Sequence, residues 1–164
     1  MEILFYDHDL AVCVKPVGLD SEAQVPAELK KTLGGEIFPV HRLDKNVGGV
    51  MVYARTKQAA AALSKAVQDG AMVKEYVAMV HGLPPESGDW EDLLWKDSRK
   101  NKVFVVRQMR KGVKAAKLAY RVLEEATPLT LVHIRLYTGR SHQIRVQFAS
   151  RGFPLAGDHK YARR

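Results

Sequence analysis

The sequence predicts an α+β domain with a mostly antiparallel, mixed sheet and flanking helices. Short β-prone runs follow one another through brief turns, as in residues 3–6 and 10–14, a pattern typical of hairpins. Helix signals occur in only three segments of the chain. The 164 residues contain no internal repeat, low-complexity tract or linker, so one α+β domain is the simplest architecture. A chain of this length can bury a core without needing a disulfide.

Most of the predicted strands come in pairs. Residues 73–80 alternate between apolar and polar positions, so that Lys74 and Tyr76 share one face of a strand. Residues 90–95 and 103–106 indicate a hairpin around a very polar connection. Residues 116–126 and 129–136 are β-prone runs that meet at a Thr-Pro turn. The polar connection at residues 96–102 is either a phosphate-contacting loop or a soluble turn.

Two helices are predicted in the first half of the chain. Residues 26–31 begin with a proline, which the first helical turn tolerates, and end before a glycine pair. Residues 57–69 are rich in alanine and have Thr56 as a plausible N-cap. Gly70 is expected to end this second helix.

A third helix is expected from about His142 to Arg151. Thr138 or Ser141 would cap its N-terminus, and Arg145 would lie next to its apolar stripe. Arg140 stands just before this N-terminus, where backbone N–H groups favour anions.

The charge is strongly divided along the chain, which carries +8 overall. Residues 1–98 hold 10 basic and 15 acidic residues, whereas residues 99–164 hold 16 basic and 3 acidic residues. A basic excess of this size favours a nucleic acid or another phosphate-rich partner over a merely solvated surface.

The apolar runs are too short to cross a bilayer, and the N-terminus is acidic where a signal peptide is basic. The single cysteine, Cys13, lies in an apolar run, which favours a reduced core thiol over a nucleophile. We therefore expect a cytoplasmic protein without a membrane partner.

One stretch of the sequence contains an isolated carboxylate that is a candidate catalytic residue. In His41-Arg42-Leu43-Asp44 the acid follows a cation, and Gly48-Gly49 then allows close backbone approach or a sharp turn before a short buried strand. This pattern predicts a strand-anchored loop carrying Arg42 and Asp44 at the edge of a cleft. The alternative is an aspartate that only caps a turn through its side-chain oxygen.

Several motifs together resemble a known family. His41-Arg42-Leu43-Asp44, the pair Lys74-x-Tyr76, the run from Gly139 to Arg145, and Gly157-Asp158 occur in the order and rough spacing of the RluA-type pseudouridine synthases. The opening hairpin, ending in Lys-Pro-Val-Gly-Leu, also resembles theirs. The likeness covers nearly the whole chain, although Val47-Gly48 stands where the family usually has Thr-Ser.

The resemblance implies a pseudouridine synthase-like fold and an enzyme that isomerises uridine to pseudouridine in structured RNA, either rRNA or tRNA. It implies no cofactor. We also expect no metal, and a monomer whose partner is RNA. We expect residues 1–164 to form a single catalytic domain, short at its C-terminus and without a separate N-terminal RNA-binding module.

Carried over residue by residue, the resemblance makes Asp44 the catalytic aspartate, Tyr76 the tyrosine near the target base, and Arg145 the arginine that pairs with the aspartate. Arg42 matches the residue associated with displacing the base from its stack. The expected substrate-binding residues are Arg42, His41, Lys74, Arg140, His142 and Gln143.

The chemistry suits a single carboxylate, because uracil leaves with its negative charge spread over two carbonyls. One ionised aspartate in a dry pocket suffices as nucleophile or base, provided that a fixed cation keeps it charged. Attack on C1′, addition to the base and proton removal from C2′ all remain open for Asp44. The base must also be flipped out of the RNA and stacked on an aromatic ring such as Tyr76.

Two rival interpretations remain. A metal hydrolase would use His41, Asp44, His142, Asp158 and His159, although their spacing matches no metal motif. A non-catalytic RNA-binding module of the same fold is the second alternative.

Overall fold

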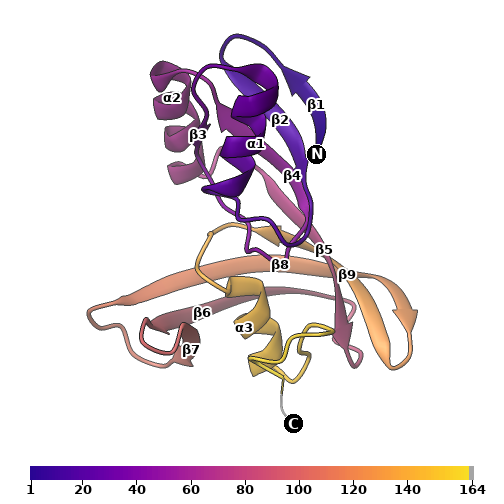
Figure 1. Cartoon of the computed structure of the whole chain (residues 1–164). Helices are drawn as coiled ribbons and strands as arrows, with labels where there is room; N and C mark the ends of the chain where they lie inside the picture. Colours follow the sequence, from indigo (N-terminus) through magenta and orange to yellow (C-terminus); the bar gives the residue numbers. More distant parts are fainter. Residues whose placement is uncertain (163–164) are drawn as a thin grey trace. The chain divides into compact units, whose positions relative to one another are not determined.

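The computed structural model describes residues 1–162, and the chain forms two compact units, Met1–Met72 and Val73–Arg164. Each unit has its own sheet (Figure 1). Each unit also has its own hydrophobic core. Every pairing between the named strands of the described residues is antiparallel. The predicted α+β class with antiparallel pairing is confirmed, and the strands are divided between two sheets.

The first unit is a four-stranded sheet with two helices, in the strand order β1-β2-β4-β3. Its core contains Cys13, Leu29, Met51 and Tyr53, all almost inaccessible to solvent. Cys13 is thus a buried thiol, as the sequence predicts. The elements in chain order are β1 (Glu2–Tyr6), β2 (Leu10–Lys15), α1 (Gln24–Leu33), β3 (Phe38–Pro39), β4 (Gly49–Ala54) and α2 (Lys57–Gln68).

Local signals explain the helices of this unit. The Thr56 side chain accepts a hydrogen bond from the Ala59 N–H (3.1 Å), so the predicted N-cap of α2 is confirmed. Helix α1 begins two residues before Pro26, which therefore lies in its first turn, where a missing N–H costs nothing. Gly34 ends α1 with a positive φ of 72°.

The second unit is a five-stranded sheet with one helix, in the strand order β5-β9-β8-β6-β7. Helix α3 contributes Phe148 to a core formed mainly by β5, β8 and β9. The ring centres of Phe148 and Trp90 lie 4.6 Å apart in this core. The elements are β5 (Lys74–His81), β6 (Ser87–Asp97), β7 (Lys102–Val106), β8 (Val113–Ala126), β9 (Leu129–Leu136) and α3 (Gln143–Ser150).

The predicted pairings of this unit are confirmed. Strands β6 and β7 form the expected hairpin, and β8 pairs with β9 across the Thr-Pro turn. Strand β5 alternates as predicted, with Lys74 and Tyr76 half-buried and Glu75 and Val77 exposed. Within residues 1–162, no helix is both long enough and apolar enough to cross a membrane.

Candidate functional site

Asp44 lies in the loop between β3 and β4, with its side chain 31% exposed. Lys15, at the end of β2, is fully buried and donates hydrogen bonds to the carbonyl groups of Pro16 (2.9 Å) and Lys45 (3.2 Å). The Gly18 N–H also donates to the Lys45 carbonyl (2.7 Å). The segment that carries Asp44 is therefore tied to the end of the opening hairpin.

A second set of contacts fixes the other side of the Asp44 loop. The Ser21 hydroxyl donates to the Leu43 carbonyl (3.0 Å) and accepts from the Leu43 N–H (3.2 Å). A Cβ at Gly48 would lie 3.3 Å from the Lys15 carbonyl oxygen, so the predicted close backbone approach is confirmed. Both flanks of Asp44 are held by contacts from residues before α1.

The Lys15 ammonium supplies positive charge beneath this loop. Burial lowers the pKa of Lys15, while the carboxylates of Asp20 and Asp44 act in the opposite direction. An ammonium near a partly buried carboxylate stabilises the negative charge that a catalytic aspartate would carry.

Arg42 and His41 occupy different environments in the same loop. Arg42 is 61% exposed, with Nη2 3.7 Å from Asp44 Oδ1 and Nη1 3.8 Å from Glu22 Oε1. The exposed guanidinium can reach a ligand at little cost. His41 Nε2 accepts a hydrogen bond from the Val52 N–H (3.1 Å), so this ring anchors the loop to β4.

Lys74 and Tyr76 lie on β5, paired with Leu136 and Ile134 of β9. Tyr76 packs against the main core of the second unit. A Cβ at Gly139 would lie only 2.7 Å from the Lys74 ammonium, so the glycine makes room for it. Burial and the charge of Arg140 both lower the pKa of Lys74. Lys74 and Arg140 therefore form one cluster of positive charge.

Arg145, on α3, binds Asp158 through two parallel hydrogen bonds. Its Nε donates to Oδ2 (2.8 Å) and its Nη2 to Oδ1 (3.0 Å), and the Asp158 side chain is only 5% exposed. Burial by itself raises the pKa of Asp158, but Arg145 and the N–H groups of Lys160 and Tyr161 outweigh it and lower that pKa. This geometry fixes the plane of the guanidinium.

Tyr161 completes the surroundings of Arg145. Its ring centre lies 5.0 Å from the Arg145 guanidinium carbon, and its hydroxyl lies 2.6 Å from His142 Nδ1. The same hydroxyl accepts the Val103 N–H (2.9 Å). His142 and Arg145 are thus both positioned by the segment that follows α3.

The N-terminus of α3 corrects one prediction. Neither Thr138 nor Ser141 caps the helix: the residue before it is His142, in the left-handed region at φ 51°, and no side chain supplies the cap. The Thr138 hydroxyl instead donates to Gln143 Oε1 (2.7 Å), which also accepts the Arg140 N–H (3.0 Å). A left-handed His142 turns the chain so that these hydroxyls miss the helical N–H groups.

Gln143 is 2% exposed, and its amide is used within the protein. Besides the two bonds at Oε1, its Nε2 donates to the Lys117 carbonyl (3.1 Å). Gln143 therefore holds the segment from Thr138 to His142 in place. Arg140 Nε donates to the Ala115 carbonyl (2.8 Å), which directs that guanidinium along β8.

Within each unit the structure brings several of the predicted residues together. His41, Arg42 and Asp44 belong to the first unit, and Lys74 with Arg140 forms a group in the second. His142 and Arg145 both contact the side chain of Tyr161. The predicted pairing of Asp44 with Arg145 joins residues of different units and stays a prediction.

Sequence reasoning missed four positioning residues, namely Lys15, Ser21, Asp158 and Tyr161. Lys15 is contained in the opening Lys-Pro-Val-Gly-Leu motif, and Asp158 and Tyr161 in a Gly-Asp-x-x-Tyr motif. These motifs could have drawn attention to the residues they contain. Their partners could not be predicted from spacing, because the contacts join residues up to 58 positions apart.

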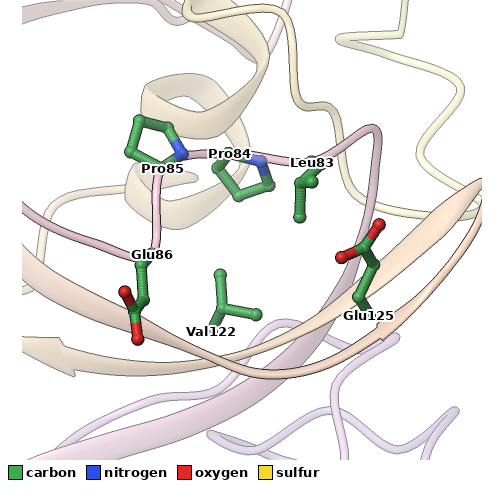
Figure 2. Close-up of a pocket in the computed structure, with 6 residues that line it drawn as sticks. All are labelled: Leu83, Pro84, Pro85, Glu86, Val122 and Glu125. Carbon is green, nitrogen blue, oxygen red and sulfur yellow. The ribbon is translucent and has the colours of Figure 1, made fainter.

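Residues 1–162 contain no group of three His, Cys, Asp or Glu side chains arranged to hold a metal ion. A hollow in the second unit lies between the loop after β5 and strand β8 (Figure 2). It contains none of the predicted site residues, and the carboxylates of Glu86 and Glu125 border it, which makes it a poor site for a polyanion. Its lining consists of Leu83, Pro84, Pro85, Glu86, Val122 and Glu125.

Comparison with known proteins decides the family. A family model described as RNA pseudouridylate synthase matches residues 9–150, which include Asp44, Tyr76 and Arg145. The chain belongs to this family. The ribosomal large subunit pseudouridine synthase D of Vibrio cholerae is 39% identical over 176 residues, covering 100% of this chain and 53% of that protein. Its namesake in Nitrosomonas europaea is 34% identical over 178 residues, covering 99% and 50%.

A solved structure of the same family supports the fold. Human RNA pseudouridylate synthase domain containing 4 superposes with a TM-score of 0.83 at 29% identity, covering 98% of this chain and 69% of the human chain. The pseudouridine synthase-like fold expected from the motifs is confirmed. The chain spans about half the length of the curated relatives it matches.

Proposed function

We propose that this chain isomerises uridine to pseudouridine in RNA and that Asp44 is its catalytic carboxylate. The observation that carries the proposal is the family match over residues 9–150, with Asp44 on a loop held by Lys15 and Ser21. A carboxylate used in chemistry must keep one geometry while the base moves, and these contacts restrict its loop.

The reaction needs no external atoms. The bond between N1 of uracil and C1′ of ribose breaks, the freed base turns, and a new bond forms between C5 and C1′. The proton on C5 then leaves, and N1 gains one, so the product is an isomer of uridine. One ionised carboxylate can act as nucleophile or base in this sequence, and three routes stay open: attack on C1′, addition to the base and proton removal from C2′.

Tyr76 and Arg145 are assigned to the same reaction. Tyr76 would stack near the flipped base and help to remove the C5 proton, because a strand tyrosine offers a flat ring with a polar tip. Arg145 would stabilise the charge of Asp44. The bidentate contact with Asp158 supports this assignment, since it holds the guanidinium in a single orientation.

Arg42 is proposed to help displace the target base from its stack. Its exposed guanidinium, within 3.7 Å of the Asp44 carboxylate, is compatible with insertion into RNA beside the reacting nucleotide. Lys74, Arg140 and His142 would contact the substrate, whereas Gln143 would act through the loop it holds.

The relatives and the charge support a proposal for the substrate and the cellular setting. Both curated relatives described above are named for the large ribosomal subunit, so large-subunit rRNA is the first RNA to test. We propose a cytoplasmic enzyme that acts as a monomer without metal or cofactor. Activity that persists in a chelator, from a species of monomeric mass in sedimentation, would support this part.

The test is tritium release from RNA labelled at C5 of uridine, because only isomerisation through C5 sets that hydrogen free. We expect release with the wild type and a loss of at least about a thousandfold with Asp44→Ala, as for removal of a covalent or acid–base catalyst. Equal release from both proteins would remove Asp44 from catalysis. Absence of release from both, with RNA still bound, would favour a non-catalytic RNA-binding module.

A further inference from the structure

The outer strand of the five-stranded sheet is flanked by dense positive charge. Residues 96–114 contain eight basic residues and one acidic residue. The acid, Asp97, accepts the backbone N–H groups of Arg99 (3.0 Å) and Lys100 (3.3 Å) through Oδ1, so it shapes the turn. Seven of the eight cations of this basic edge are exposed, namely Lys96, Arg99, Lys100, Arg107, Arg110, Lys111 and Lys114.

The fold brings the two loops of the basic edge to the same part of the sheet. The first is the β6–β7 turn, and the second, residues 107–112, leads from β7 across to β8, which pairs with the opposite side of β6. The second of these loops approaches Trp95. The Arg110 guanidinium lies 5.6 Å from the Trp95 ring centre, and the Trp95 ring centre lies 6.1 Å from that of Phe104 on β7.

Acidic side chains do not offset this charge. None of the ion pairs formed within residues 1–162 involves a cation of residues 96–114. Lys160 adds to the cluster, because its ammonium donates to the Asn101 carbonyl (2.8 Å) at the β6–β7 turn. Cations left uncompensated at this density repel one another unless a polyanion lies over them.

Protection of an edge strand does not explain the pattern. Natural edge strands resist aggregation by carrying charge on the strand itself. Strand β7, Lys102–Val106, has one lysine followed by four apolar residues, and the other seven cations stand outside it. Five of these seven stand in the two loops, where long side chains can follow an irregular partner.

We propose that the basic edge binds the phosphate backbone of the substrate RNA. The proposal rests on the proposed function for the identity of the partner, and it assigns to residues 96–114 a role in affinity. Each phosphate that a cation neutralises releases counterions, so the affinity should depend steeply on salt.

The experiment compares two variants that lose the same charge. The loop variant replaces four cations of the basic edge, and the control variant replaces four exposed lysines on α1 and α2. Each dissociation constant is measured from 0.05 to 0.3 M KCl with a 20-nucleotide single-stranded RNA and with a transcript of large-subunit rRNA. The substitutions are Arg99→Gln, Lys100→Gln, Arg110→Gln and Lys111→Gln in the loop variant, and Lys30→Gln, Lys31→Gln, Lys57→Gln and Lys65→Gln in the control.

A plot of log affinity against log salt has a negative slope, and each phosphate contact contributes roughly 0.7–0.9 to its magnitude. We expect this magnitude to decrease by about 3 in the loop variant, which loses four cations, and by less than about 1 in the control. Equal losses in the two variants, or no loss in either, would overturn the proposal. If the loop variant melts early, the pair Arg99→Gln and Lys100→Gln should show about half the loss. Tritium release by the wild type tests the proposed function separately, because binding is measured here without turnover.

Discussion

Asp158 illustrates how one buried carboxylate can determine what an arginine is able to do. Its two oxygens accept parallel bonds from Arg145, and Oδ1 also accepts the N–H groups of Lys160 (3.0 Å) and Tyr161 (3.4 Å). The acid therefore orients the side chain on α3 and closes the turn after it. An arginine held in this way loses little rotamer entropy when it meets a second anion.

Replacing Asp158 by Asn should cost about 2–3 kcal/mol of the free energy of unfolding at pH 7, because it breaks a largely buried, charge-assisted pair. Urea unfolding measures this cost. If Arg145 serves the reaction, the rate at saturating RNA should also fall, while RNA affinity changes little. A loss confined to affinity would instead place Arg145 at a phosphate.

The same pair gives a defined pH dependence. The pKa of Asp158 is lowered in the folded protein from its usual 3.8, so its stabilising effect is complete above about pH 4 and is lost as pH falls through the lowered value. The wild type should therefore lose stability below about pH 4 more steeply than Asp158→Asn. Parallel acid unfolding curves would contradict this account.

Lys15 offers a test of the loop that carries Asp44. Lys15→Met keeps the length of the buried chain but removes the donor to the Pro16 and Lys45 carbonyls. We expect single-turnover activity to fall about 10- to 100-fold, since a displaced catalytic group is costly. The exposed Lys65, replaced by Met, is the matched control, and equal activities of the two variants would show that Lys15 does not position the loop.

At the scale of elements, the segment before α3 depends on one buried amide. Gln143→Leu removes three hydrogen bonds and leaves the Arg140 N–H and the Lys117 carbonyl without this partner. The expected cost is about 2–4 kcal/mol in urea unfolding. Gln108→Leu, at an exposed position, should cost less than about 0.5 kcal/mol. Similar costs for both would contradict the positioning role of Gln143.

Elements governed by local signals could be predicted from the sequence. The Thr56 cap and the alternation of Lys74 and Tyr76 involve neighbours within a few residues. The N-terminus of α3 could not, because a left-handed His142 and a bond between the Thr138 and Gln143 side chains replaced the expected cap. A side-chain partner can redirect a hydroxyl that would otherwise cap a helix.

At the scale of the whole molecule, charge follows the division into units. Residues 1–72 contain 8 basic and 9 acidic residues, whereas residues 73–164 contain 18 and 9. The positive charge that predicts a polyanion partner therefore belongs to the second unit, whereas the proposed catalytic aspartate belongs to the first. Composition indicated the excess of charge, but its concentration at the basic edge required the strand order.

Only those residues of the candidate site that belong to the family's motifs could be assigned a role from the sequence. Asp44, Tyr76 and Arg145 stand in positions of an ordered set that the family model also matches. Lys15 and Asp158 remained hidden because their roles depend on contacts formed in three dimensions, across 30 and 13 residues of sequence.

The most direct measurement is a nucleoside analysis of large-subunit rRNA transcripts after incubation with the wild type, Asp44→Asn and Asp9→Asn. Asp9 is an exposed aspartate of the same unit and serves as the control. The account predicts one pseudouridine gained for each uridine lost, without free uracil, from the wild type and Asp9→Asn, and none from Asp44→Asn. Free uracil from the wild type, or pseudouridine formed at the wild-type rate by Asp44→Asn, would contradict it.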